Sequence, residues 1–424
     1  MRPCGQRETG GAQDGVEPCG PSCVGSAVVN DLRVDETRAQ PVVAGVIAAI
    51  VGFSSSFTVV LAGLAAAGAT KREAASGLLV LSVFMGLTGI WLSWRTRMPI
   101  SAAWSTPGAA LLVSAGGVHG GYTAALGAFA FAGLLTIIAG LWRPLAGWIA
   151  AIPGPLASAL LAGVLLPVCL SPAKSMVAEP WITLPIIVTF TLMLRFARRW
   201  AVPAVLVAAI VAVVIAQPDS GGDFHPTLPR LVFHAPAWDS KALLSIGLPL
   251  FIVTMASQNI AGMAVLRSFG FSPPLRPLLV ATGGATAAGA PFGVHGVNLA
   301  AITAALVAGP DADPRPERRW IAGAASGATY LVIGPLAGVA VALVAAAPTV
   351  VIGAVAGLAL LGALGGALAA AMSEPDLRDA AIVTLVVSAS GISAWGVSAP
   401  FWGLAAGLVF QAAVKRRRPA PPPE

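Results

Sequence analysis

The fold is decided by two stretches in opposite halves of the chain, MPISAAWSTPGAALLVSAGG (Met98–Gly117) and GAPFGVHGVNLAAITAALVAG (Gly289–Gly309). Both are apolar and free of Asp, Glu, Lys and Arg. In both, Pro or Gly and an aromatic residue precede a run of small residues, so helical structure is interrupted at first and favoured afterwards. We therefore predict an extended first part followed by a half-helix in each stretch.

The start of each half-helix can be placed from the residue types. Ser105 or Thr106 can cap the first one, and Pro107 and Gly108 suit its first turn. Three residues interrupt the second stretch: Pro291, Gly293 and Gly296. We expect the second half-helix to begin near Asn298.

The composition around these stretches is that of a membrane protein. Of the 424 residues, 57% are apolar and only 10% are charged, and the mean hydropathy is +0.84. Soluble domains carry about 25% charged residues, and disordered chains have low hydrophobicity. The net charge of +7 is spread between apolar blocks and gathered at the C-terminus, with no basic face for a nucleic acid. We expect a polytopic protein whose environment is the lipid bilayer.

Charge-free blocks set the number of membrane spans. A helix needs about 20 residues to cross the bilayer, and a charge at its centre costs about 2.5 to 3.5 kcal/mol. Four blocks are too long for one crossing and must each fold back once: 98–142, 277–310, 320–373 and 380–414. Together with six shorter blocks they give fourteen spans. The two stretches quoted above are then spans 3 and 10.

The positions of Lys and Arg support this count. With the N-terminus in the cytoplasm, the outer loops hold only a few of the 25 Lys and Arg residues, namely Lys71, Arg72, Lys174, Arg230 and Lys241. Cytoplasmic loops normally carry the excess of these residues. We therefore expect both termini in the cytoplasm, with a polar, disordered tail over residues 1–40 and a basic, Pro-rich tail over residues 415–424.

The chain divides into two related halves of seven spans, residues 41–218 and 242–414, separated by an extracytoplasmic loop at 219–241. Sequences that begin at Gly45 and Gly247, an offset of 202, place their polar clusters in register. Because seven is odd, the second copy enters the membrane upside down. Inverted repeats of this kind are typical of secondary transporters, which bind substrate near the membrane midplane.

The broken spans 3 and 10 locate the predicted site. Free backbone groups inside a bilayer are tolerated only where they line a cavity or are buried in protein. Two half-helix N-termini would face this cavity, each with N–H groups and a partial positive charge of about +0.5. No charged residue lies at a predicted span centre. The pattern favours an anionic substrate that is bound without a fixed cation, a metal or a cofactor.

We expect substrate contacts from spans 1, 3, 8 and 10, at Ser54, Ser55, Ser56, Phe57, Trp104, Ser105, Thr106, Gly108, Gln258, Asn259, Gly296 and Asn298. For the serines and Trp104 the alternative is helix packing, and for the two amides it is hydrogen bonding between helices. His295, in the break of span 10, is the candidate for proton coupling, and its alternative role is to cap free backbone groups. His119 is expected at the membrane surface, and Tyr330 is interpreted as bonding between helices.

Four motifs resemble the BenE-type benzoate/proton symporter family: MPISAAWSTPGAALL, TMASQNIAGMAVLRSFGF, APFGVHGVNLAAITAAL and DPRPERRWIAGAASGATY. The resemblance runs from about residue 41 to 414. It implies an all-α fold related to the nucleobase/ascorbate and sulfate transporters, with a core domain (spans 1–4 and 8–11) and a gate domain (spans 5–7 and 12–14). It also implies a bacterial inner-membrane location and a gate-domain homodimer. Nucleobase relatives carry acidic residues in spans 8 and 10, where this chain has Gln258, Asn259, His295 and Asn298, so a nucleobase substrate is disfavoured.

The residues and the resemblance agree on import of benzoate or a similar aromatic carboxylate with a proton, by alternating access. A carboxylate of pKa about 4 is anionic at neutral pH, and its entry against a negative-inside potential costs about 2.3 kcal/mol per 100 mV unless a proton accompanies it. Its ring would contact Trp104 and either Phe57 or Phe292. Transport or facilitated diffusion of another small organic anion is the alternative. An intramembrane enzyme would need a nucleophile with a base, or clustered carboxylates, and the spans have neither.

Overall fold

The computed structural model describes residues 22–142, 152–197, 200–216, 228–300, 303–394 and 397–414. The first part of the predicted N-terminal tail (1–21), part of the loop between the halves (217–227) and the C-terminal tail (415–424) lie outside the described residues. The chain forms two compact units, Met1–Gln40 and Pro41–Glu424, and the second contains every predicted span. Helix α1 begins at Ser22, within the stretch for which the composition predicts a disordered tail.

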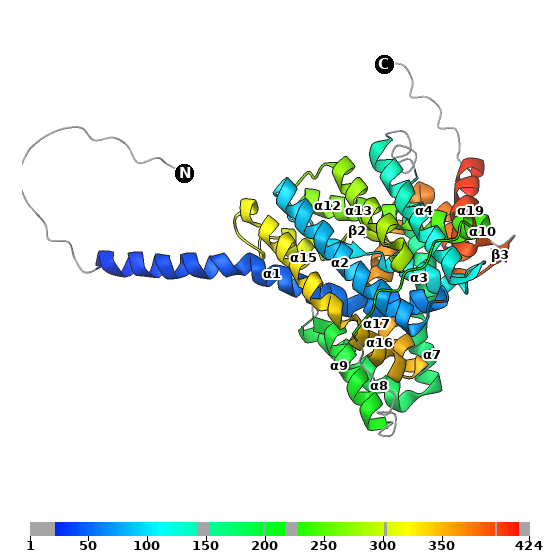
Figure 1. The fold of residues 1–424 in the computed structure, drawn as a ribbon, viewed down its shortest axis with the longest axis horizontal. Helices are drawn as coiled ribbons and strands as arrows, with labels where there is room; N and C mark the ends of the chain where they lie inside the picture. Colours follow the sequence, from blue (N-terminus) through cyan, green and yellow to red (C-terminus); the bar gives the residue numbers. More distant parts are fainter. Residues whose placement is uncertain are drawn as a thin grey trace, which may run out of the picture. The chain divides into compact units, whose positions relative to one another are not determined.

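The described part of the first half of the chain contains helices and one short strand (Figure 1). Its elements are α1 (Ser22–Ala66), α2 (Lys71–Thr96), β1 (Ala102–Trp104), α3 (Thr106–Ala115), α4 (Gly121–Leu141), α6 (Gly154–Cys169), α7 (Ser171–Ala178), α8 (Pro180–Phe196) and α9 (Ala201–Ala216). Local sequence signals explain several boundaries. Thr70 and Glu73 form a reciprocal capping box at the start of α2, and Arg97 ends that helix in the left-handed conformation.

The second half begins with one long helical segment that is interrupted by two π-helical turns. Its parts are α10 (Ser240–Ala242), η3 (Leu243–Gly247), α11 (Leu248–Thr254), η4 (Met255–Ile260) and α12 (Ala261–Ser268). The following elements are α13 (Leu275–Gly289), η5 (Ala290–Phe292), β2 (Val297–Leu299), α14 (Ala304–Ala308), η6 (Pro316–Arg318), α15 (Trp320–Ile333), η7 (Gly334–Leu336), α16 (Ala337–Ala346), α17 (Thr349–Ala371), η8 (Pro375–Leu377), α18 (Arg378–Ala389), β3 (Ser393–Ala394), β4 (Val397–Ser398) and α19 (Ala399–Val414). Single-turn π-helices are often found at functional sites, and η4 contains Gln258 and Asn259.

Among the described residues, seven helical segments are long and apolar enough to cross a bilayer. They are Ala39–Ala66, Lys71–Thr96, Gly121–Leu141, Gly154–Ala178, Ser240–Ser268, Pro316–Ala346 and Thr349–Ala371. Shorter apolar helices include α3, which lies in block 98–142 together with α4, and α8 and α19, which occupy other charge-free blocks. The chain is therefore an all-α polytopic membrane protein, while the total of fourteen spans stays a prediction.

The helices form two sets according to their packing partners. In the first set α2 packs on α13 and α15, and α4 packs on α13. In the second set α6 packs on α17 and α18, α18 packs on α19, and α8 packs on α9. These sets are the predicted core and gate domains.

The core domain contains two close helix crossings that the inverted repeat relates to each other. Where α2 crosses α15, a Cβ at Gly86 would lie 2.7 Å from the carbonyl oxygen of Gly327. Where α13 crosses α4, a Cβ at Gly283 would lie 2.7 Å from the carbonyl oxygen of Gly133. In the predicted repeat, span 2 (α2) corresponds to span 9 (α13) and span 4 (α4) to span 11 (α15), so the two crossings are expected to be counterparts. Glycine is required at these positions because the backbones meet there.

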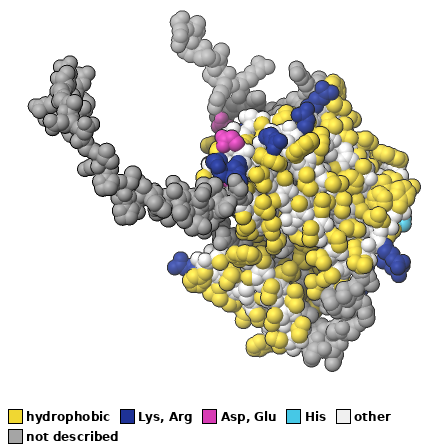
Figure 2. Space-filling model, turned by 60° about the vertical axis from the view of Figure 1, so that its left-hand side comes forward, with side chains coloured by type: hydrophobic (Ala, Val, Ile, Leu, Met, Phe, Trp, Pro, Cys, Tyr) yellow, Lys and Arg dark blue, Asp and Glu magenta, His cyan; other side chains and the backbone are white. Residues whose placement is uncertain are grey.

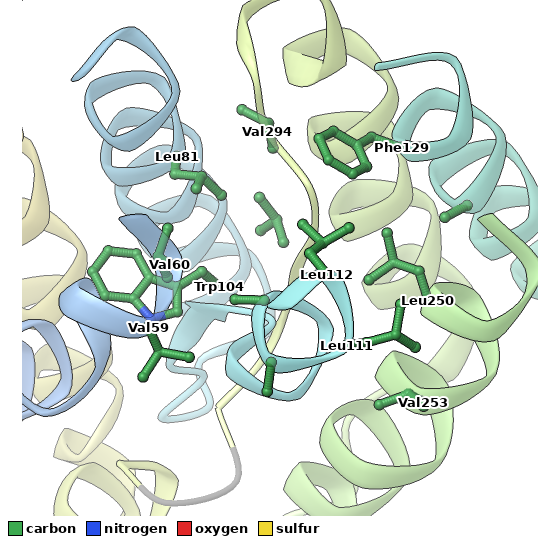
Figure 3. Close-up of a cluster of buried hydrophobic side chains, with 14 of the residues drawn as sticks. Val59, Val60, Leu81, Trp104, Leu111, Leu112, Phe129, Leu250, Val253 and Val294 are labelled. Carbon is green, nitrogen blue, oxygen red and sulfur yellow. The ribbon is translucent and has the colours of Figure 1, made fainter. Parts of the chain in front are cut away.

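The buried side chains surround the half-helix α3. Figure 3 shows Leu111 and Leu112 of α3 among Val59 and Val60 of α1, Leu81 of α2, Phe129 of α4 and Leu250 of α11. All of these side chains are at most 1% exposed. The outer surface is also apolar, with few charged groups on the face shown in Figure 2, as expected for a surface in contact with lipid.

Candidate functional site

The two broken spans cross as a pair of short antiparallel strands. Ala102 of β1 lies opposite Leu299 of β2, and Trp104 lies opposite Val297. The ladder continues through Ser105, whose N–H donates to the Gly296 carbonyl at 3.0 Å. The extended first parts predicted for both spans are therefore confirmed, and the facing backbone groups of the two strands satisfy each other.

The predicted start of the second half-helix near Asn298 is wrong. Asn298 lies in β2, opposite Ala103, and the described helix α14 begins only at Ala304. The reason is that β2 is bonded along its other edge as well. Asn259 accepts from the N–H of Leu299 at 3.0 Å. The Asn259 side chain, which comes from another span, therefore favours the strand over a helix.

Thr286 adds a second bond of this type, because its Oγ1 accepts from the Val297 N–H at 2.8 Å. Asn298 itself is fully buried, and its amide is satisfied when it accepts from the Ser105 N–H at 3.0 Å and donates to the Leu299 carbonyl at 2.8 Å. Asn259 is 1% exposed. Both amides therefore hold the strand pair in place.

Ser105 caps the half-helix α3, as predicted. Its Oγ accepts from the Gly108 N–H at 3.1 Å and lies 2.7 Å from Oγ1 of Thr254. Position 108 has no room for a side chain, because a Cβ there would collide with Leu250 and lie 2.7 Å from the Ser105 Oγ. The start of α3 is thus fixed by contacts with the helix α11 of the other repeat.

His295 contacts the backbone of Ser105, the residue that caps α3. It is fully buried, and its Nε2 donates to the Ser105 carbonyl at 3.0 Å. Its ring and that of Phe129 pack in a T-shaped arrangement, with 6.2 Å between ring centroids. Its Nδ1 has no hydrogen-bond partner in the described part of the chain. His119, by contrast, is half-exposed and lies 3.4 Å from Asp239.

A cavity of about 940 Å³ separates the core domain from the gate domain. Its core side is formed by α1, β1, the start of α3, η4, α15 and Thr303 beside α14. Its gate side is formed by residues of α6, α8, α9 and α17, such as Ser158 and Phe190. The volume is typical of a pocket for a small ligand. The cavity therefore lies where the broken spans face the gate.

Five of the predicted contact residues line this cavity: Ser55, Ser56, Trp104, Thr106 and Gln258. The other predicted residues are not part of its lining, namely Ser54, Phe57, Ser105, Gly108, Asn259, Gly296, Asn298 and the coupling candidate His295. Ser54 donates to the Ile50 carbonyl of its own helix at 2.7 Å, and Phe57 stacks on Phe53 with centroids 5.6 Å apart. Direct substrate contact by these residues stays a prediction.

The cavity wall also contains residues that the sequence interpretation missed. Tyr330 of α15, for which only bonding between helices was predicted, lines the cavity together with Thr303 and Ser257. The ring of Trp104 is 6.3 Å from that of Tyr330, and its Nε1 donates to Ser56. The one sequence feature that could have pointed to Tyr330 as a cavity residue was its position at the end of the DPRPERRWIAGAASGATY motif.

None of the described residues that line the cavity is charged. Thr106 and Pro107 at the start of α3 belong to the lining, so the positive end of this half-helix faces the cavity. The second half-helix, α14, has only five residues and contributes Leu306. The cavity can therefore hold an anion through helix-end, hydroxyl and amide dipoles, with an aromatic surface beside them.

Sequence comparison gives relatives along almost the whole chain. Residues 35–413 match the BenE family, described as benzoate membrane transport protein. "Inner membrane protein YdcO" of Escherichia coli (strain K12) is 38% identical over 382 residues, which are 89% of this chain and 96% of that protein. "Benzoate membrane transport protein" of Acinetobacter baylyi is 31% identical over 374 residues, which are 87% of this chain and 93% of that protein.

Solved structures share the fold at low sequence identity. The transmembrane domain of the cyanobacterial bicarbonate transporter BicA has a TM-score of 0.56 and 15% identity, over 87% of this chain and 98% of that one. The murine Slc26a9 anion transporter in its inward-facing state has a TM-score of 0.59 and 13% identity, over 88% of this chain and 68% of that one. These likenesses establish the fold.

Proposed function

The chain belongs to the BenE family of benzoate membrane transport proteins, and we propose that it imports benzoate or a similar aromatic carboxylate together with a proton. It is a membrane transporter of a small anion and not an enzyme. The observation that carries the proposal is the uncharged cavity of about 940 Å³ between the broken spans and the gate domain. This cavity offers both an aromatic wall and a helix N-terminus.

The two parts of an aromatic carboxylate match the two kinds of surface in the cavity. The Trp104 and Tyr330 rings provide a surface for the substrate ring. Thr106 at the start of α3 and the Gln258 amide provide dipoles for the carboxylate. Phe57 is buried away from the cavity, so its predicted ring contact would require a movement of α1.

The proposed transport cycle is a movement of the core domain against the gate domain. The cavity wall is divided between the two domains, with the broken spans on the core side and α6, α8, α9 and α17 on the gate side. A rigid core that slides against the gate would expose the same binding surface first to one side of the membrane and then to the other. The strand pair and the glycine crossings make the core suited to move as one body.

His295 is our candidate for proton coupling, and its proposed action is indirect. The Nε2–H···O=C bond to Ser105 leaves Nδ1 free to accept a proton. Ser105 in turn caps α3, whose first residues line the cavity. A proton on His295 would therefore act on the anion through the start of α3.

The names of the relatives support a bacterial inner-membrane location, to which we add cytoplasmic termini and a homodimer formed through the gate domain. The arrangement of Lys and Arg supports the orientation. Cysteine-labelling from each side of the membrane at Ser373 and at Lys71 tests it, because our topology places these positions in an inner and an outer loop respectively.

Uptake of labelled benzoate into proteoliposomes tests the proposed function. We expect accumulation above the external concentration when an inward proton gradient is imposed, and equilibration only when the gradient is abolished. Uptake that ignores the gradient would favour a facilitator of the same fold. Absence of benzoate uptake under both conditions, with another organic anion transported, would overturn the substrate assignment.

A further inference from the structure

Three serine hydroxyls on the cavity wall already donate their protons within the protein. Ser55 and Ser56 both donate to the Gly52 carbonyl, at 2.9 and 3.3 Å, and Ser257 donates to a carbonyl of its own helix. The indole N–H of Trp104 donates to Ser56 at 2.8 Å. A carboxylate only accepts hydrogen bonds, so it needs donors. Ser55, Ser56 and Ser257 are therefore poorly placed to bind one.

Tyr330 and Gln258 differ from these residues. Both line the cavity, with 2% and 9% of their surface exposed, and neither side chain has a hydrogen-bond partner in the described part of the chain. Neither the Tyr330 hydroxyl nor the Gln258 amide is among the polar atoms that are sealed off without a partner, so both are accessible from the cavity. Thr106 and Ser158 are further wall hydroxyls without a described bond, but both are more exposed. The two side chains can therefore donate to a ligand in the cavity.

Gly52 makes room for the Tyr330 hydroxyl. A Cβ at position 52 would collide with the Tyr330 hydroxyl oxygen and lie 3.2 Å from Cγ2 of Thr303, whereas Cζ of Tyr330 would be 3.7 Å away, an ordinary contact. Only the hydroxyl oxygen of Tyr330 thus depends on the absence of a side chain at Gly52. This dependence provides a second way to displace the hydroxyl.

We propose that Tyr330 is a specificity-determining residue, whose hydroxyl donates to the substrate carboxylate beside the Gln258 amide while its ring packs on the substrate. The proposal rests on the proposed function and assigns recognition of the carboxylate to α15 rather than to the serines of α1. Ser55 and Ser56 then serve to shape α1 and to orient Trp104. Tyrosine suits this task because it combines an aromatic face with one polar end.

Equilibrium binding to the purified full-length protein tests the assignment, with labelled benzoate, a ring-substituted benzoate, an aliphatic monocarboxylate and bicarbonate as probes. Tyr330→Phe should weaken the binding of the preferred carboxylate about ten-fold or more, because a hydrogen bond to a charged group is lost. Tyr122→Phe is the matched control. It removes the only other tyrosine hydroxyl, which belongs to a residue outside the cavity lining, and should leave the affinity unchanged.

Gly52→Ala tests the same hydroxyl without removing it, so the result does not depend on one variant folding. It should weaken carboxylate binding in the wild-type background. In the Tyr330→Phe background it should change the affinity by no more than about two-fold, because the atom with which the new Cβ collides is then missing. Additive losses in the double variant would contradict the role of Gly52.

The outcomes separate this inference from the proposed function. If the wild type binds benzoate and Tyr330→Phe binds it equally well, Tyr330 is not the donor, although benzoate remains the substrate. If the wild type binds only another carboxylate of the panel, the benzoate assignment fails, and the Tyr330 variants are measured with that anion. If the wild type binds none of the probes, both proposals fail.

Discussion

The half-helices α3 and α14 occupy related places in the two repeats, yet they are held in different ways. α3 has ten residues and is fixed at its start by the Ser105 side chain. α14 has five residues, and no side chain bonds to its backbone at the N-cap Thr303. Instead its end is held, because Arg319 donates to the Ala308 carbonyl at 2.9 Å. The repeat therefore preserves the strand crossing, while only one half-helix has a rigid N-terminus at the cavity.

Arg319→Ala should have the largest effect on stability, and should affect α14 rather than α3. The Arg319 side chain is 6% exposed and also donates to the Asp313 carbonyl at 2.7 Å. Removal of this buried group leaves carbonyls unsatisfied, and we expect a loss of about 3 kcal/mol, measured by thermal unfolding in detergent. Arg319→Lys should recover only part of it, since Lys lacks the guanidinium fork. An unchanged unfolding temperature would show that α14 does not depend on Arg319.

Gly108→Val should disturb α3 and leave α14 in place. The new side chain collides with Leu250 and Ser105, and overpacking of this kind costs roughly 2–3 kcal/mol. Because the start of α3 is displaced, benzoate binding should be lost even where the variant still folds. Gly284→Ala is the control, since a Cβ at that position of α13 meets no atom within 4 Å. Normal binding by the Val variant would show that the position of α3 is unimportant.

Ser105→Ala and Thr303→Ala form a direct test of the asymmetry. Ser105→Ala removes a cap and a bond to Thr254, so unfolding should become easier by about 1–2 kcal/mol. Thr303→Ala removes only a bond to Ser101 at 3.2 Å, which is worth about 1 kcal/mol or less. Thermal unfolding of both variants in one detergent gives the comparison. Equal losses would mean that the two half-helices are held alike.

His295→Gln should have the smallest effect on stability but a clear effect on transport. The Gln amide can still donate to the Ser105 carbonyl, so the start of α3 should stay in place and benzoate affinity should change by no more than about two-fold. Glutamine has no group that protonates in the relevant pH range. Uptake in proteoliposomes should therefore lose its stimulation by an inward proton gradient. Retained stimulation would assign coupling to another group.

The sequence predicted the architecture well, because the relevant signals are local. Pro107 and Gly108 mark the first turn of α3, and Pro291 and Gly293 interrupt the second stretch where the structure has an irregular segment. Charge-free blocks located the helices, since a charge in lipid is costly whatever its neighbours. The division into core and gate came from the resemblance and agrees with the observed packing.

The details of the site were less predictable, because they depend on residues that are distant in sequence. Whether the chain at Asn298 is strand or helix is decided by Asn259 and Thr286, which belong to other spans. The serines of α1 suggested a polar binding surface, but Ser55 and Ser56 bond to their own helix, as short hydroxyl side chains often do. The position of Tyr330 at the cavity follows from helix packing alone.

The strand pair has a consequence for biosynthesis. Ala103 and its partner Asn298 are separated by 195 residues. At a synthesis rate of about 5–20 residues per second, β1 leaves the ribosome roughly 10–40 s before β2 exists. During this interval β1 is an unpaired strand edge, which lipid does not tolerate. The insertion machinery or the neighbouring helices must therefore shelter the first half, and a chain cut before residue 297 should be a substrate for membrane proteases rather than a stable half-transporter.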